Sequence, residues 1–291
     1  MDIGAAEAGT GSLAPALAAK RDRALAVLRQ LGSVAVALSG GADSSLVALL
    51  AREALAQRAI AVTGVSPSLA SDELAEARAF AAGIDIRLIE LATTELDDPR
   101  YAANGADRCY HCKSTLFAAM EQLIEREGIA AIVDGYNADD AREVLYGRTA
   151  AQQRGVRSPL YEAGITKAEV RELLRWSDLT VADKPASACL ASRIPTGSTV
   201  TREALAQIEQ AERFLRGLGI AQVRVRHHGQ VARIEVGPDA LEAVLALRDA
   251  VATELHRLGF RHVTLDLDGY RRGSTAGTAP AIELVSIDPP R

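Results

Sequence analysis

The stretch SGGADSS, residues 39–45, decides the fold because it joins two segments of different character. Residues 33–38 before it form a short apolar run rich in valine, and residues 46–55 after it have helical composition. We therefore predict a strand, a glycine turn and a helix. Glycines let a ligand approach the backbone closely, and the first turn of a helix offers unpaired N–H groups to an anion. The stretch is thus a candidate phosphate site.

The same stretch excludes two common nucleotide-binding loops. It has neither the lysine of a GxxxxGK[ST] loop nor the GxGxxG pattern of a dinucleotide site. Ser44 and Ser45 can add hydroxyl donors. Asp43 has two interpretations, a contact to magnesium or nucleotide and a cap of the following helix. For the whole stretch, the alternative is a tight turn of small residues that binds nothing.

Strands alternate with helices along the first two thirds of the chain. Further apolar runs lie at 59–65, 84–91 and 130–134, with segments of helical composition between them. This pattern predicts an α/β fold with a parallel sheet covered on both faces. Ligands bind at the carboxyl ends of the strands in such sheets, so we expect Ser39 and Asp134 at one edge.

The pattern changes after residue 181. Strict alternation at 223–236 predicts a hairpin around Gly229, followed by a helix at 239–257 and a strand at 262–267, which together form a small α+β unit. The expected division is a flexible leader at 1–18, an α/β domain at 19–182, a cysteine-bearing loop or linker at 183–200, a small α+β domain at 201–272 and a partly disordered tail at 273–291.

Composition excludes several classes of protein. The formal net charge of −5 argues against a protein that grips a long stretch of nucleic acid, which usually needs a basic face. No apolar run approaches the roughly 20 residues of a membrane span. The start of the chain has no basic segment before an apolar core, and the three cysteines are an odd number. We therefore expect a cytoplasmic protein with reactive or ligating thiols.

The three cysteines are candidates for metal or redox chemistry. Cys109 and Cys112 form a CxxC pair that we expect in a loop, and Cys189 lies much later in the chain. Three thiolates can hold three irons of a cubane cluster and leave the fourth iron open, whereas zinc would need a fourth ligand, for which His111 is nearest. A redox pair with an unrelated third cysteine, or three inert buried thiols, are the other interpretations.

Six segments carry a resemblance to known proteins. They are SGGADSS (39–45), RCYHCK (108–113), GYNADD (135–140), KPASACLASRIPTG (184–197), VRVRHHGQVARIEV (223–236) and LDLDGYRRGS (265–274). Together they resemble the LarE family, the ATP-dependent sulfur transferases that build the nickel-pincer nucleotide cofactor of lactate racemase. The resemblance implies that the domain at 19–182 is a PP-loop ATP pyrophosphatase domain, of the adenine nucleotide α-hydrolase-like type.

The resemblance also implies the reaction and its binding residues. A carboxylate of pyridinium-3,5-biscarboxylic acid mononucleotide is adenylated with ATP and Mg²⁺ and then becomes a thiocarboxylate. The implied nucleotide ligands are Ser39, Gly40, Gly41, Asp43, Ser44 and Ser45. The implied substrate or phosphate ligands are Lys113, Arg193, Arg224 and Arg226, and the implied residues near a divalent metal are Glu212 and Glu235. From pattern alone, a solvated strand face is the favoured interpretation of Arg224 and Arg226, and the resemblance raises the phosphate role to equal standing. The two glutamates are equally surface acids.

The source of sulfur follows from the number of cysteines. Family members with only the cysteine that matches Cys189 surrender its sulfur, and members with all three are similar to cluster-bearing proteins. The resemblance therefore implies a 4Fe–4S cluster on Cys109, Cys112 and Cys189, with Cys189 as the sacrificial alternative. It further implies a homo-oligomer, with hexamers known in the family, that works beside other enzymes of nickel-pincer biosynthesis. The donor that reloads the sulfur is not implied.

Three other functions compete with this interpretation. A cluster-dependent tRNA thiolase of the same superfamily would bind tRNA tightly at moderate salt, which a shift in the mobility of the tRNA would reveal. An amidating synthetase that uses ammonia would stay active after all three cysteines were replaced. An ATP-sensing or metal-delivery module would release no pyrophosphate with the carboxylate substrate.

Overall fold

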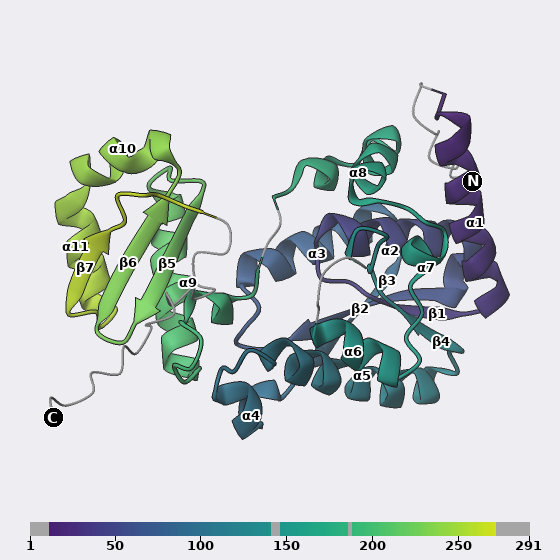
Figure 1. Ribbon diagram of the computed structural model, residues 1–291, viewed down its shortest axis with the longest axis horizontal. Coiled ribbons are helices and arrows are strands. Elements are labelled where there is room, and N and C mark those ends of the chain that lie inside the picture. The colour runs from purple at the N-terminus through teal and green to yellow at the C-terminus, as the bar shows by residue number, and fades with distance from the viewer. Residues whose placement is uncertain (1–11, 141–145, 186–187, 272–291) are drawn as a thin grey trace, which may run out of the picture. The chain divides into compact units, whose positions relative to one another are not determined.

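The structure is a computed structural model, and it describes residues 12–140, 146–185 and 188–271 (Figure 1). The chain divides into two compact units, each with its own hydrophobic core. The first unit comprises residues 1–190 and 200–205, and the second comprises residues 191–199 and 206–291. The proposed tail at 273–291 lies outside the described residues. None of the helices in the described part of the chain is long and apolar enough to cross a membrane.

The first unit alternates helices and strands as expected. Its main elements are α1 (Pro15–Leu31), β1 (Val34–Ala37), α2 (Ala42–Leu55), β2 (Ala59–Val65), α3 (Ser71–Gly83), β3 (Arg87–Ala92), α4 (Pro99–Ala102), α5 (Arg108–Glu127), β4 (Ala131–Val133), α6 (Tyr146–Gln153), α7 (Pro159–Glu162) and α8 (Lys167–Trp176). Short 3₁₀ helices join several of them, among them η2 (Glu95–Asp97), η4 (Thr180–Asp183) and, across the boundary between the two units, η5 (Leu190–Arg193).

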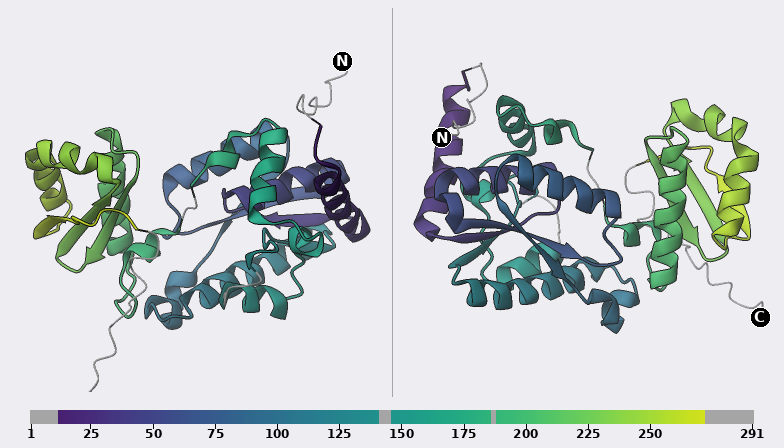
Figure 2. Two further views of the ribbon diagram at one scale, coloured as in Figure 1. Left: turned by 45° about the horizontal axis from the view of Figure 1, so that its top comes forward. Right: turned by 180° about the vertical axis from the view of Figure 1, so that it is seen from behind.

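A four-stranded sheet in the order β3-β2-β1-β4 forms the middle of the first unit, and all of its pairs are parallel. β1 is buried at every position because it has a core on both faces. Val34 and Val36 join the cluster that contains Leu46 of α2, while Ala35 packs with Met120 of α5. Figures 1 and 2 show α5 and α6 on one face, with α1, α2 and α8 on the other. The predicted α/β fold with a doubly covered parallel sheet is therefore confirmed.

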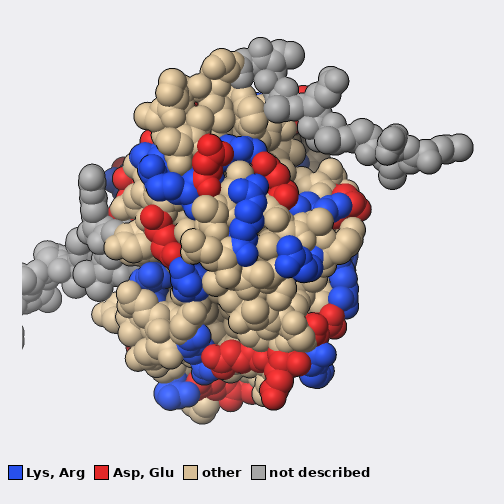
Figure 3. All heavy atoms as spheres, turned by 90° about the vertical axis from the view of Figure 1, so that its right-hand side faces the viewer, with Lys and Arg blue, Asp and Glu red and all other residues tan. Residues whose placement is uncertain are grey.

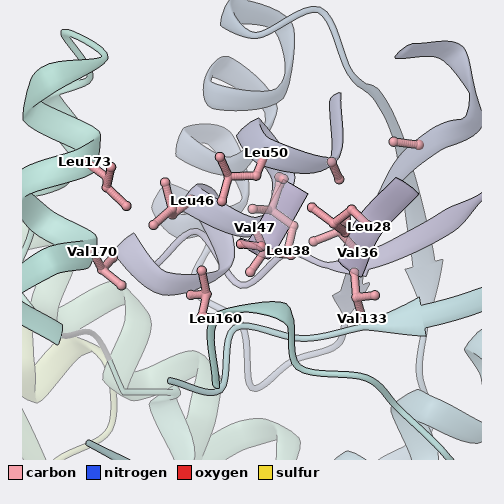
Figure 4. Packing of buried hydrophobic residues seen from close by; sticks show 14 of the residues in the cluster. Leu28, Val36, Leu38, Leu46, Val47, Leu50, Val133, Leu160, Val170 and Leu173 are labelled. Atoms are coloured by element: carbon pink, nitrogen blue, oxygen red, sulfur yellow. The ribbon is translucent and has the colours of Figure 1, made fainter. Parts of the chain in front are cut away.

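Leucine and valine fill the core between the sheet and α2. In Figure 4, Leu46 and Leu50 of α2 lie between Val36 of β1 and Leu173 of α8. These side chains are buried almost completely, and burial of each contributes about 1.5–3 kcal/mol relative to exposure. This packing fixes α2, and with it the glycine turn at the start of α2.

The second unit is a small α+β structure. Its elements are most of α9 (Arg202–Gly217), β5 (Val223–His228), β6 (Val231–Val236), η6 (Pro238–Ala240), α10 (Leu241–Ala246), α11 (Arg248–Arg257) and β7 (His262–Leu265). The first residues of α9, up to 205, belong to the first unit. β5 and β6 are antiparallel, and β6 pairs with β7 in parallel. Gly229 makes the hairpin turn with a φ of +65°, a value that favours glycine. The predicted hairpin is thus confirmed.

Two expected elements differ from the structure. The single helix expected at 239–257 is wrong, because η6, α10 and α11 occupy this segment and the two α-helices meet at Leu247. The loop expected around the CxxC pair is also wrong, because α5 begins at Arg108. The carbonyl of Asp107 accepts hydrogen bonds from the backbone N–H groups of Tyr110 (2.8 Å) and His111 (3.4 Å), which places both cysteines in the first turns of the helix.

Candidate functional site

The glycine turn has the geometry expected of an anion site. Gly40 has a φ of +74°, and Gly41 precedes the first residue of α2. The hydroxyl of Ser44 accepts a hydrogen bond from the Ser39 backbone N–H (3.1 Å) and donates one to the Gly41 carbonyl (3.1 Å). The side chain therefore ties the turn to the helix. The first N–H groups of α2 stay free of helical acceptors, as an anion site requires.

A second glycine brings the end of β4 onto this turn. A Cβ atom on Gly135 would lie 2.7 Å from the backbone nitrogen of Ser44 and 3.0 Å from the carbonyl carbon of Asp43. Both are backbone atoms of α2, so they cannot move aside cheaply. Only glycine permits this approach, which sets the loop after β4 against the first turn of α2.

One cavity of about 450 Å³ lies at this junction. Ser39 and Asp134 both line it, which confirms the expectation that they share the edge at the carboxyl ends of the strands. The cavity also contains residues from α5 and from the start of α6. Its lining residues are Ala37, Ser39, Gly41, Asp43, Ser44, Ala106, Cys109, Lys113, Phe117, Asp134, Gly135, Tyr136, Asp140, Tyr146, Gly147 and Arg148.

Two of the expected nucleotide ligands are not part of this lining. Gly40 turns its carbonyl to Lys184, whose Nζ donates a 3.0 Å hydrogen bond to it. Ser45 is fully buried, and its hydroxyl has no hydrogen-bond partner in the structure. Lys184 also forms ion pairs with Glu73 (2.5 Å) and Glu76 (2.6 Å), so it supports the turn from outside the cavity.

Asp43 is held by partners that are distant in sequence. Its carboxylate forms an ion pair with Lys167, the first residue of α8, and accepts a 3.2 Å hydrogen bond from Asn137. Residue Gly41 occupies the capping position of α2, and no side-chain cap is formed there. The capping interpretation of Asp43 is therefore wrong. Asp43 lines the cavity instead and is paired there with Lys167.

The three cysteines all lie in the first unit and none forms a disulfide. Cys109 and Cys189 are exposed, and Cys112 is partly buried. Burial raises the pKa of the Cys112 thiol to about 12, and charges on Glu95, Cys189 and Cys109 add to the rise. Among the described residues, however, no three histidine, cysteine or acidic side chains are gathered so as to hold a metal ion.

The arginines expected to bind substrate have different surroundings. Arg193 makes two hydrogen bonds to Glu212 (2.8 and 3.1 Å), and Arg226 makes two to Glu235 (2.9 and 2.6 Å). All four of these side chains are buried, so each carboxylate neutralises an arginine.

Arg224 and Lys113 differ from this pattern. Burial, reinforced by the charge of Arg193, lowers the pKa of Arg224, whose guanidinium lies 5.6 Å from the ring centre of Tyr270. Lys113 stands in the cavity, 5.7 Å from the ring centre of Phe117. Neither cation forms an ion pair within the part of the chain that the structure describes. Lys113 belongs to the first unit, and the three arginines belong to the second.

Sequence reasoning missed two cations of the first unit. Lys167 meets Asp43 across 124 positions, and Arg148 lines the cavity from α6. Neither stands in a motif, and only the folded sheet brings them to the glycine turn. Arg148 is the one basic residue of α6 and Lys167 one of three in α8, which is the ordinary composition of a helix surface.

Comparisons with known proteins agree with this architecture. Residues 21–141 match the asparagine synthase family. The pyridinium-3,5-bisthiocarboxylic acid mononucleotide synthase of Lactiplantibacillus plantarum is 35% identical over 272 residues, which cover 93% of this chain and 99% of that protein. An uncharacterized protein of Synechocystis is 43% identical over 84% of this chain and 92% of its own length. A tRNA(Ile)-lysidine synthase of Novosphingobium aromaticivorans is 34% identical over 40% of this chain and 34% of its own length.

Proposed function

The chain belongs to the pyridinium-3,5-bisthiocarboxylic acid mononucleotide synthase (LarE) family, and we propose that it converts carboxylates of pyridinium-3,5-biscarboxylic acid mononucleotide to thiocarboxylates at the expense of ATP. One observation carries the proposal. A glycine turn with the geometry of a phosphate site lines the same cavity as Cys109. A phosphate-binding turn and a cysteine in one cavity suit a reaction that activates a carboxylate with ATP and then replaces a carboxylate oxygen with sulfur.

The first step is adenylation, because a carboxylate has no good leaving group. A carboxylate oxygen attacks the α-phosphorus of ATP, the bond to the bridging oxygen of the β-phosphate breaks, and pyrophosphate leaves with the electron pair. The N–H groups at the start of α2 would hold the phosphates. The carboxylate of Asp43 would face Mg²⁺, and its ion pair with Lys167 would then have to break. We propose Ser39, Gly40, Gly41, Asp43, Ser44 and Ser45 as the nucleotide site, with Gly40 and Ser45 acting through the shape of the turn.

The second step is attack of sulfur on the acyl adenylate, with AMP as the leaving group. A thiolate is a far better nucleophile than water at neutral pH. If Cys189 is the direct donor, its sulfur first forms a thioester with the acyl carbon. Loss of the Cα proton to a base then breaks the Cβ–S bond, which releases the thiocarboxylate and leaves dehydroalanine. Cys189 is exposed, as attack on a bound substrate requires.

We also propose that Cys109, Cys112 and Cys189 hold a 4Fe–4S cluster in the loaded protein. Thiolates are the usual ligands of such clusters, and the three cysteines lie in one unit with no disulfide between them. The described residues hold no assembled metal group, so the thiols would have to converge on loading. Iron and acid-labile sulfide, measured after anaerobic reconstitution, are expected at about four each per chain. The variant Cys109→Ala, Cys112→Ala should lose both, and iron retained in that variant would refute this ligand set.

The substrate is anionic, so cations must bind it. Lys113 and Arg224, neither of which forms an ion pair within the described residues, are the better supported candidates, while Arg193 and Arg226 would have to exchange their carboxylates for the phosphate. The corresponding proposal for Glu212 and Glu235 as ligands of a divalent metal requires the same exchange. The proposed location is the cytoplasm and the proposed assembly a homo-oligomer, alongside other enzymes of nickel-pincer biosynthesis.

The test is a reaction of the purified chain with Mg·ATP and the pyridinium mononucleotide. Pyrophosphate should appear only when both are present, and mass spectrometry should show exchange of oxygen for sulfur in the product. Without pyrophosphate the proposed function fails. A tRNA substrate is disfavoured by the net charge of −5 and by the face in Figure 3, where basic and acidic side chains are interspersed.

A further inference from the structure

One cation of the cavity has no part in the chemistry described so far. Arg148 of α6 lines the same cavity as Cys109. Its guanidinium carbon lies 4.1 Å from the ring centre of Tyr136, and its Nη1 donates a 2.6 Å hydrogen bond to the hydroxyl of Ser158. That hydroxyl in turn donates a 2.6 Å hydrogen bond to the carboxylate of Asp134. The guanidinium is therefore oriented from two sides.

Arg148 forms no ion pair with any residue that the structure describes. Arg148 donates a hydrogen bond to Ser158 and lies over the rings of Tyr136 and Tyr161, and its charge helps to lower the pKa of Glu162 without a direct contact. Its Nε atom is buried and has no hydrogen-bond partner. A guanidinium offers a planar fork of N–H donors that matches two oxygens of a carboxylate or phosphate. The cavity thus holds an oriented guanidinium that is in no ion pair with a described residue and can bind an anion.

We propose that Arg148 binds the carboxylate that becomes adenylated, an inference that rests on the proposed function. The phosphates of ATP have their own donors in the glycine turn and the first turn of α2. The carboxylate must approach the negatively charged α-phosphate and needs a cation of its own. Of the cations that line the cavity, Lys113 is a flexible point charge, whereas Arg148 is held in one orientation and can align a planar carboxylate.

The test compares the full chain with the variants Arg148→Gln and Arg148→Lys. For Arg148→Gln we expect the KM for the pyridinium mononucleotide in pyrophosphate release to rise about 10-fold or more, while the Kd for Mg·ATP stays within about 2-fold. Arg148→Lys should recover only part of this loss, because an ammonium keeps the charge and loses the fork. Arg78→Gln is the matched control, since Arg78 is an exposed arginine of α3 paired with Glu90.

Several outcomes would overturn the inference. An equal loss of Mg·ATP affinity would make Arg148 a ligand of the nucleotide, and an unchanged KM would remove it from the site. If Arg148→Gln does not fold, Ser158→Ala removes one orienting hydrogen bond and should raise the same KM by a smaller factor; no rise would refute the inference.

A separate measurement keeps the inference apart from the proposed function. If the wild-type chain releases no pyrophosphate with the mononucleotide, the proposed function fails. Isothermal titration with pyridine-3,5-dicarboxylate then decides about the arginine site alone. The wild-type chain should bind this probe about 10-fold more tightly than Arg148→Gln. Equal binding would overturn the inference.

Discussion

At the scale of single residues, the glycine turn depends on atoms that its own sequence does not contain. Gly135 lies almost a hundred positions after the turn, yet the absence of its side chain sets the distance between β4 and α2. The hydroxyl of Ser44 then holds the turn from within. The proposed phosphate site is therefore formed by two separate segments, and a change in either should alter nucleotide binding.

Gly135→Ala tests this dependence. The added methyl group would lie 2.7 Å from the nitrogen of Ser44, so the first turn of α2 must shift. Overpacking of this kind costs about 1–3 kcal/mol, and we expect the Kd for Mg·ATP to rise about 10- to 100-fold. Gly83→Ala in α3 is the control, because nothing lies within 4 Å of its added Cβ. Similar nucleotide affinity in both variants would show that the close contact is unimportant.

At the scale of elements, the sequence predicts those strands, helices and turns that neighbouring residues determine. The strand before the turn, the helix after it and the hairpin at Gly229 follow from apolar periodicity and from residues that tolerate tight turns. The start of α5 was missed because polar residues and a CxxC pair resemble a loop, although the apolar face with Phe117 and Met120 continues the same helix.

Long-range partners could not be predicted from pattern. Alternation with valine places Arg224 and Arg226 on one face of β5, and it gives no means of telling them apart. In the structure Arg226 is buried against Glu235, whereas Arg224 stacks on Tyr270 and forms no ion pair with a described residue. Ion pairs between separate elements depend on packing that emerges only when the whole unit folds, and the same holds for Asp43 with Lys167.

Glu235→Gln separates a structural role from a substrate role on β6. Its carboxylate is fully buried and pairs with Arg226 and Arg233. Removing one partner of a buried pair typically costs about 3–5 kcal/mol, so urea denaturation should show a large loss of stability. Arg87→Gln breaks an exposed pair with Glu127 and should cost less than about 1 kcal/mol. If Glu235→Gln were as stable as Arg87→Gln, the pair would be dispensable for folding.

Two histidines of β5 should make the stability of the protein depend on pH. Burial lowers the pKa of His227, whose ring contacts Gln207 and Phe260, and burial lowers that of His228. The unfolded chain therefore binds more protons near pH 6, and stability present above the ordinary pKa is lost as the pH falls through the lowered values. The free energy of unfolding should fall between pH 7 and pH 5. The fall should be smaller in His227→Gln, and an equal fall in both chains would exclude a contribution from this ring.

At the scale of the whole molecule, the chain has two separate cores, so we expect its two units to differ in their response to a bound nucleotide. The cluster around Leu46 belongs to the first unit, and the cluster around Val225 belongs to the second. The glycine turn and its cavity lie entirely in the first unit. A ligand stabilises what it binds, so a nucleotide should act on one core and leave the other unchanged.

Urea denaturation with and without a non-hydrolysable ATP analogue and Mg²⁺ measures this difference. At 100 times its Kd the analogue should stabilise the first unit by about 2.7 kcal/mol, so that one of two transitions moves to higher urea. Glu235→Gln should move the other transition to lower urea, because Glu235 is buried in the second unit. A single transition that responds to both changes would mean that the two units unfold together. The proposed nucleotide cavity would then be stabilised by both cores.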